Sequence, residues 1–111
     1  IEVYDTFITE FKDSKSEHIL KLIAKVYINK GVALKELWEL QKAIDVYDAS
    51  IKKFKDSKSE PILVLVAKAY INKGNVLEEL GKSQKAIDAY DTVIKEFKDS
   101  KSEPILEQVA N

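Results

Sequence analysis

The sequence predicts an all-α protein, arranged as a short stack of helical hairpins. Two observations support this prediction. The decapeptide FKDSKSEPIL occurs at 54–63 and again at 97–106, with the near copy FKDSKSEHIL at 11–20, and other landmarks recur at the same step of 43 residues. Within each copy, apolar residues recur three and four positions apart, which is typical of helices with one buried face, and no strand-like alternation competes with this pattern.

The repeat divides the chain into four parts. Residues 1–13 are the second half of a truncated repeat, 14–56 and 57–99 are two full repeats, each a hairpin, and 100–111 are the start of a further repeat. Neither end coincides with a hairpin boundary or shows the polar outer face of a capping unit. We therefore expect either a fragment of a longer array or a chain whose end faces meet other copies.

The first helix of the second copy is predicted from one apolar stripe and a second line that broadens it. These residues are Leu63, Val66, Tyr70, Gly74, Leu77 and Leu80, with Leu65, Ala69 and Val76. Two start signals precede the helix: Ser57 with Glu60 fits a capping box, and Ser59 before Pro61 is an alternative cap. Gly81 follows the stripe and suits the left-handed residue at which many helices end.

The second helix follows from another apolar stripe, made of Ala86, Ile87, Tyr90, Val93, Ile94 and Phe97. A single hairpin of this size cannot bury both stripes, whereas copies stacked side by side build a continuous core. The predicted architecture is therefore a right-handed helical-hairpin solenoid and not a compact bundle.

The turn of the first hairpin differs from that of the second. The letters LWEL at 37–40 replace LGKS at 80–83, so that a glycine is lost and two large apolar residues are gained. Two interpretations are open. Either Trp38 and Leu40 cover the end of the hairpin, or the turn straightens, fuses the two helices and allows chains to exchange them.

Residues 67–97, AKAYINKGNVLEELGKSQKAIDAYDTVIKEF, resemble a tetratricopeptide repeat (TPR). The marks of that family are an aromatic residue, a Gly, an apolar residue, an Ala and a second aromatic residue at set spacings. Here they are Tyr70, Gly74, Leu77, Ala86 and Tyr90, with Val93 after them, and in the first copy Tyr27, Gly31, Leu34, Ala43 and Tyr47. Gly on one helix and Ala on the other are expected to let the two backbones approach closely.

The chain departs from the TPR pattern in its period, in one lysine of each copy, and in the Asp/Ser/Lys joint that replaces the family's Pro after the second helix. The step of 43 exceeds the usual length of about 34, and the extra residues fall in the joint and at the start of the first helix, so we expect first helices of about twenty residues or more. Lys30 and Lys73 stand where the family often has Leu.

Lys73 lies on the apolar stripe. Either its stem packs on tyrosine while the ammonium reaches water or a second-helix aspartate, or it is a ligand-binding cation. The candidate aspartates are Asp45, Asp48, Asp88 and Asp91.

Composition and spacing argue against most chemistry. The chain has no Cys, its 18 basic residues are all Lys, and its net charge is −1, which excludes thiolate sites and disfavours nucleic-acid binding. His18, the only histidine, is expected at an exposed helix start, and Glu78 and Glu79 are consecutive and so point apart on a helix. No apolar run approaches the roughly 20 residues of a membrane span, and no metal or phosphate-loop motif occurs. We expect no enzyme activity, cofactor, metal site, nucleic-acid partner or membrane association.

The resemblance implies that the first helices line a concave groove for an extended peptide or a helix of a partner protein. The residues it places there are Ile28 and Asn29 in the first copy and Ile71 and Asn72 in the second. Helical spacing adds Lys25, Val32, Lys35 and Glu36 in the first copy and Lys68, Asn75, Glu78 and Glu79 in the second. Asn29 and Asn72 are the first candidates because an amide both donates to and accepts from a peptide backbone. A merely solvated helix face is the alternative. The family's clamp for a terminal carboxylate is not expected, because Ile28 and Val32 occupy its positions.

The function expected from the sequence is a non-catalytic scaffold for protein–protein interaction. No secretion signal is recognisable, and a cytoplasmic location is favoured, although no pattern identifies a compartment. The alternative function is a self-assembly module that forms homo-oligomers through uncapped ends or helix exchange. The residues that would carry self-association are Tyr4, Trp38, Leu40 and Val109.

Overall fold

The structure is a computed structural model and describes residues 1–97 of the chain. These residues form five α-helices: α1 (Glu2–Phe11), α2 (Glu17–Glu36), α3 (Leu40–Phe54), α4 (Glu60–Glu79) and α5 (Ser83–Phe97). The all-α prediction is confirmed for this part of the chain. The expected start of a further repeat at 100–111, including Val109, lies outside the described residues.

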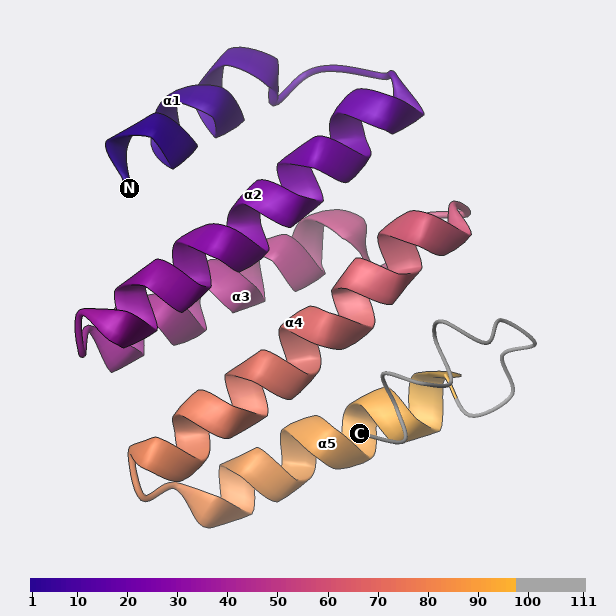
Figure 1. Cartoon of the computed structure of the whole chain (residues 1–111). Coiled ribbons are helices and arrows are strands. Elements are labelled where there is room, and N and C mark those ends of the chain that lie inside the picture. The colour runs from indigo at the N-terminus through magenta and orange to yellow at the C-terminus, as the bar shows by residue number, and fades with distance from the viewer. Residues whose placement is uncertain (98–111) are drawn as a thin grey trace.

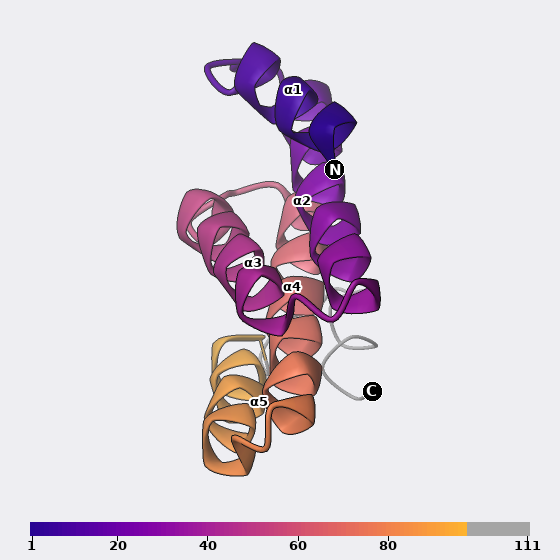
Figure 2. The same ribbon diagram turned by 90° about the vertical axis from the view of Figure 1, so that its left-hand side faces the viewer.

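The helices pack in sequence-adjacent pairs, as helical hairpins require. Each helix contacts the next along the chain, and α2 also contacts α4. Figure 2 shows α3 and α5 on one side of the α2 and α4 pair. The two first helices therefore form one layer, which faces the viewer in Figure 1, and the second helices lie behind it.

The two first helices have the length that the extended repeat predicted. α2 and α4 contain 20 residues each, whereas α3 and α5 contain 15. The added residues build a hydrophobic cluster of their own at the N-terminal halves of the first helices, which includes Ile23, Phe54, Ile62 and Phe97. The other cluster, around Tyr47 and Leu77, lies beside the C-terminal halves. The longer period thus adds packed core and not only loop.

The serine caps are now assigned. Ser16 is the N-cap of α2, and its hydroxyl accepts a hydrogen bond from the Ile19 N–H at 3.4 Å. Ser59 is the N-cap of α4, so the capping box at Ser57 is wrong. The Ser57 hydroxyl lies two residues before that cap and accepts from the Ser59 N–H at 3.0 Å. Ser59 therefore occupies the cap position without a capping hydrogen bond from its side chain, and the Ser57 hydroxyl binds the backbone of the joint.

Both hairpin turns are bent, so the interpretation that the first turn straightens and fuses two helices is wrong. Gly81 has φ +74°, and Trp38 adopts the same left-handed conformation with φ +60°. The turns also share their hydrogen bonds: the N–H groups of Trp38 and Gly81 donate to carbonyls three residues back, each at 2.9 Å. The idea that Trp38 covers the hairpin end is also wrong, because 74% of its surface is exposed, whereas Leu40 is buried in the core.

Replacing Trp38 with Gly is expected to stabilise the protein by about 1 kcal/mol, because a left-handed backbone strains every residue with a Cβ. Little burial is lost, since the indole is mostly exposed. The matched control is Gly81→Ala, whose new Cβ meets no atom within 4 Å, so that it introduces only the backbone strain. Urea denaturation should show the two substitutions shifting the midpoint in opposite directions. A lower midpoint for Trp38→Gly would contradict the strain argument.

The glycines of the first helices make room for tyrosine rings of the second helices. A Cβ on Gly31 would overlap the ring of Tyr47, and a Cβ on Gly74 would overlap the ring of Tyr90. The close contact is thus between a backbone and a side chain, and not only between two backbones as the sequence suggested. Ala43 and Ala86 are buried beside these contacts. The same interlock occurs in both hairpins.

Candidate functional site

The exposed surface of α2 and α4 is continuous across the two hairpins. We call it the first-helix face. Val32 and Lys35 of α2 and Asn72 and Asn75 of α4 line a small pocket of about 100 Å³, with Tyr47 as a further wall. One ion pair also spans the two helices, with the Lys35 Nζ 3.4 Å from the Glu79 Oε1. Residues from two repeats therefore contribute to one surface.

The predicted partner-binding residues differ in their accessibility. The exposed ones are Lys25, Asn29, Val32, Lys68 and Asn75, and the partly exposed ones are Ile71 and Asn72. Ile28 is only 4% exposed and belongs to the core, so its side chain is not available to a partner. The structure brings Val32, Asn72 and Asn75 together in the small pocket. The positions 25, 29 and 32 follow one another at helical spacing on α2, and 68, 72 and 75 do so on α4.

Two asparagines of this face lie beside tyrosines of the second helices. The Tyr90 hydroxyl donates to the Asn75 Oδ1 at 2.5 Å, so the two N–H donors of that amide remain for another acceptor. Burial raises the pKa of Tyr47 above its ordinary value of 10.0, and a hydrogen bond with the Asn72 side chain opposes this shift. The Asn75 amide is therefore oriented before any ligand arrives.

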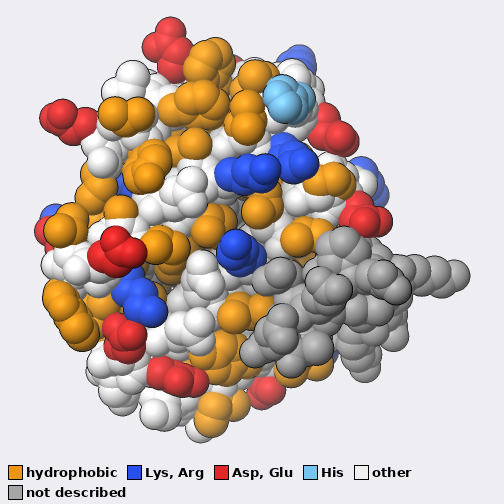
Figure 3. Space-filling model, in the orientation of Figure 1, with side chains coloured by type: hydrophobic (Ala, Val, Ile, Leu, Met, Phe, Trp, Pro, Cys, Tyr) orange, Lys and Arg blue, Asp and Glu red, His pale blue; other side chains and the backbone are white. Residues whose placement is uncertain are grey.

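Charges divide along the first-helix face. Figure 3 shows blue side chains toward the middle of α2 and α4, both colours where the two helices begin, and mainly red side chains where they finish. The exposed lysines near the middle are Lys25 and Lys68, the exposed glutamates at the first residues are Glu17 and Glu60, and those at the other end are Glu36, Glu78 and Glu79. Between these lysines and the glutamates at the other end, the face therefore has a basic and an acidic edge.

A larger hollow lies on the opposite side of α4, between α3 and α5, and has a volume of about 370 Å³. Its floor includes Ile44, Leu77 and Ala89, and its rim carries Lys82 and Lys85. This hollow was not predicted from the sequence. The signal that could have indicated it is a smaller side chain in the second copy, where Ala89 stands at the position of Val46 in the first.

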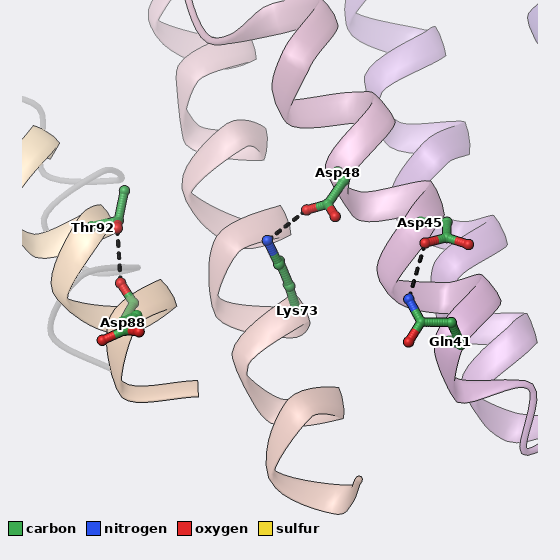
Figure 4. Close-up of polar contacts among 6 residues, drawn as sticks. All are labelled: Gln41, Asp45, Asp48, Lys73, Asp88 and Thr92. Atoms are coloured by element: carbon green, nitrogen blue, oxygen red, sulfur yellow. Dashed lines mark hydrogen bonds and ion pairs between the residues drawn. The ribbon is translucent and has the colours of Figure 1, made fainter. Parts of the chain in front are cut away.

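Lys73 lies in this hollow and binds an aspartate of the preceding hairpin. Its Nζ is 2.6 Å from the Asp48 Oδ1 (Figure 4). Lys30 makes the equivalent pair with Asp5 at 2.5 Å. The prediction that the lysine ammonium reaches a second-helix aspartate is confirmed. Because the ammonium already has an anionic partner within the chain, Lys73 is a poor candidate for a ligand-binding cation.

His18 is exposed at the start of α2. Within residues 1–97, no group of three or more His, Asp or Glu side chains is placed to hold a metal ion. In the same part of the chain, no helix combines the length and the apolar character needed to cross a membrane.

Comparison with known proteins gives one match. Residues 67–99 match the tetratricopeptide repeat family, and this stretch runs from the middle of α4 through α5. No curated protein and no solved structure matches the chain. A tetratricopeptide repeat suggests a protein–protein interaction module, the family is in general non-catalytic, and no catalytic domain was found.

Proposed function

We propose that the chain is a non-catalytic interaction scaffold that binds a peptide or a helix of a partner protein along the first-helix face. The observation that supports this best is the pocket at which two hairpins meet, where Tyr90 holds the amide of Asn75 and Asn72 lies beside Tyr47. Oriented amides match the main-chain groups of a peptide and lose little side-chain entropy on binding.

The proposed architecture is a right-handed solenoid whose units are 14–56 and 57–99, with 1–13 and 100–111 as parts of adjoining units. The repetition of one inter-hairpin contact supports it. The pairs Asp5–Lys30 and Asp48–Lys73 each join a second helix to the next first helix and lie 43 residues apart. Equivalent contacts at a constant step are the basis of a stacked array.

The double substitution Asn29→Ala with Asn72→Ala tests the proposed site. The probe is a peptide isolated on the full chain from a random phage-displayed library. Each amide hydrogen bond contributes roughly 1 kcal/mol, so the double variant should bind the peptide about tenfold or more weakly, measured by fluorescence anisotropy. The urea midpoint checks that the variant remains folded, because Asn29 is exposed whereas Asn72 interacts with the buried Tyr47 hydroxyl.

The matched control is Gln41→Ala with Gln84→Ala, another pair of exposed amides 43 residues apart. Each of these glutamines donates to an aspartate four residues later in its own second helix, at 3.1 Å. This pair should leave binding unchanged. If it weakened binding while the asparagine pair did not, the partner would lie over the second helices and the proposed site would be wrong.

Self-association is a second candidate function, favoured by one observation. Leu37 and Trp38 are 61% and 74% exposed at the same turn, which leaves an apolar tip on the first hairpin. Tyr4 is partly exposed on α1, whereas Leu40 is buried in the core and is not available for this role. Sedimentation velocity over a concentration series tests this function. If a Trp38→Gly variant associates as the parent does, the apolar tip is not the self-association surface.

A further inference from the structure

We propose that the first-helix face selects an extended peptide with acidic side chains on one flank and basic side chains on the other. This inference rests on the proposed function and specifies its ligand. Three rows define the face. They are the lysine row (Lys25 and Lys68), the asparagine row (Asn29 and Asn72) and the glutamate row (Glu36 and Glu79).

The rows are a consequence of helix geometry and of the repeat. Positions 25, 29, 32 and 36 are four, three and four residues apart, so they share one side of α2. The same spacing recurs 43 residues later on α4, beside α2. At 1.5 Å per residue, the lysine row lies about 6 Å from the asparagine row, and the glutamate row lies about 10 Å beyond it. The two edges are thus far enough apart for a peptide main chain between them.

The charges of the two edges are largely uncompensated within the described residues. Lys25 and Lys68 are exposed and make no ion pair with any residue of 1–97. Glu36 is likewise unpaired there, and Glu79 has only the exposed, 3.4 Å pair with Lys35. A ligand with the opposite charge on each flank therefore gains attraction at both edges, and one with uniform charge gains it at only one.

An extended ligand suits the asparagine row better than a helix does. In a helix the main-chain N–H and C=O groups bond one another, whereas in an extended peptide they are free to bond the amides. Successive side chains of an extended chain point to opposite sides, so one set meets the lysine row and the other the glutamate row. Side chains on the same flank are about 7 Å apart, which flexible lysines on helices 8–10 Å apart can match.

The test compares the peptides selected by the full chain with those selected by a charge-reversed variant, Lys25→Glu with Lys68→Glu. A random dodecapeptide phage library is the probe for both. The parent should enrich sequences in which acidic and basic residues alternate, and the variant should enrich basic residues at the formerly acidic positions. A peptide selected by the parent should bind the variant about tenfold or more weakly. The control, Lys42→Glu with Lys85→Glu, makes the same charge change on the second helices and should alter neither result.

The outcomes separate this inference from the proposed function. One outcome would contradict the proposed charge preference but not the proposed binding site. In that outcome the asparagine substitutions weaken peptide binding, while the Lys25→Glu and Lys68→Glu variant selects peptides with the same charges as the parent does. Selected sequences with apolar residues three and four apart, which is the mark of a bound helix, would also overturn this inference. Binding that ignores the asparagine substitutions, or no enrichment over empty resin, would contradict both.

Discussion

Gly31→Ala is expected to destabilise the protein by about 1–3 kcal/mol, the usual effect of overpacking a core. In an ordinary helix the same substitution stabilises by about 1 kcal/mol, so the sign itself is informative. The new Cβ would overlap the ring of Tyr47, which is only 1% exposed and has no room to move. Gly74→Ala should be less severe, because its partner Tyr90 is only partly buried and can turn toward solvent.

A double-mutant cycle with Tyr47→Ala checks the cause of this effect. Removing the ring should by itself cost about 3–5 kcal/mol, the range for truncating a large buried aromatic side chain. In that background Gly31→Ala no longer meets a ring and should become stabilising by about 1 kcal/mol. Urea denaturation of the four proteins gives the coupling energy. Additive effects of the two substitutions would show that the glycine is needed for a reason other than the ring.

Features that repeat with the period were predictable, because each copy places the same residue in the same contact. The lengths of the first helices and the Lys73–Asp48 ion pair belong to this class. The pair follows from a lysine on an apolar stripe, since a buried stem leaves the ammonium only a nearby anion or water. Because the lysine and the aspartate recur 43 residues apart, the ion pair is expected to recur as well, and Lys30 and Asp5 form it.

Features that depend on several neighbours at once were not predictable from one helix. Ile28 lies next to Asn29 and was expected on the surface, but α2 contacts α1, α3 and α4, which leaves only a narrow exposed strip. One of the two interpretations of the first turn had Trp38 cover the end of the hairpin, yet the left-handed backbone there carries its side chain into solvent. The N-cap of α4 was not predictable for the same reason. Both Ser57 and Ser59 fit a helix start, and only the backbone path of the joint shows that Ser59 is the cap.

Phe54→Ala is expected to destabilise the protein by about 3–5 kcal/mol. Phe54 opens the repeated decapeptide, is 4% exposed, and belongs to the cluster that the added residues of the long first helices build. Its ring meets that of Tyr27 edge-on, with centroids 6.3 Å apart. Removing the ring leaves a cavity between two hairpins, and those neighbours are held by their own backbones, so collapse into the space is limited.

The chain contains a matched control for this substitution. Phe11 occupies the same position of the decapeptide in the first copy, but it is 40% exposed at the end of α1. Phe11→Ala should therefore cost about 1 kcal/mol or less, since much of the ring already contacts water. Thermal and urea unfolding of the two variants compares the loss of the same side chain, in the same sequence context, from a buried and from an exposed position. Equal losses would mean that the cluster at the joint contributes little to stability, and the extra residues of the period would then need another explanation than core packing.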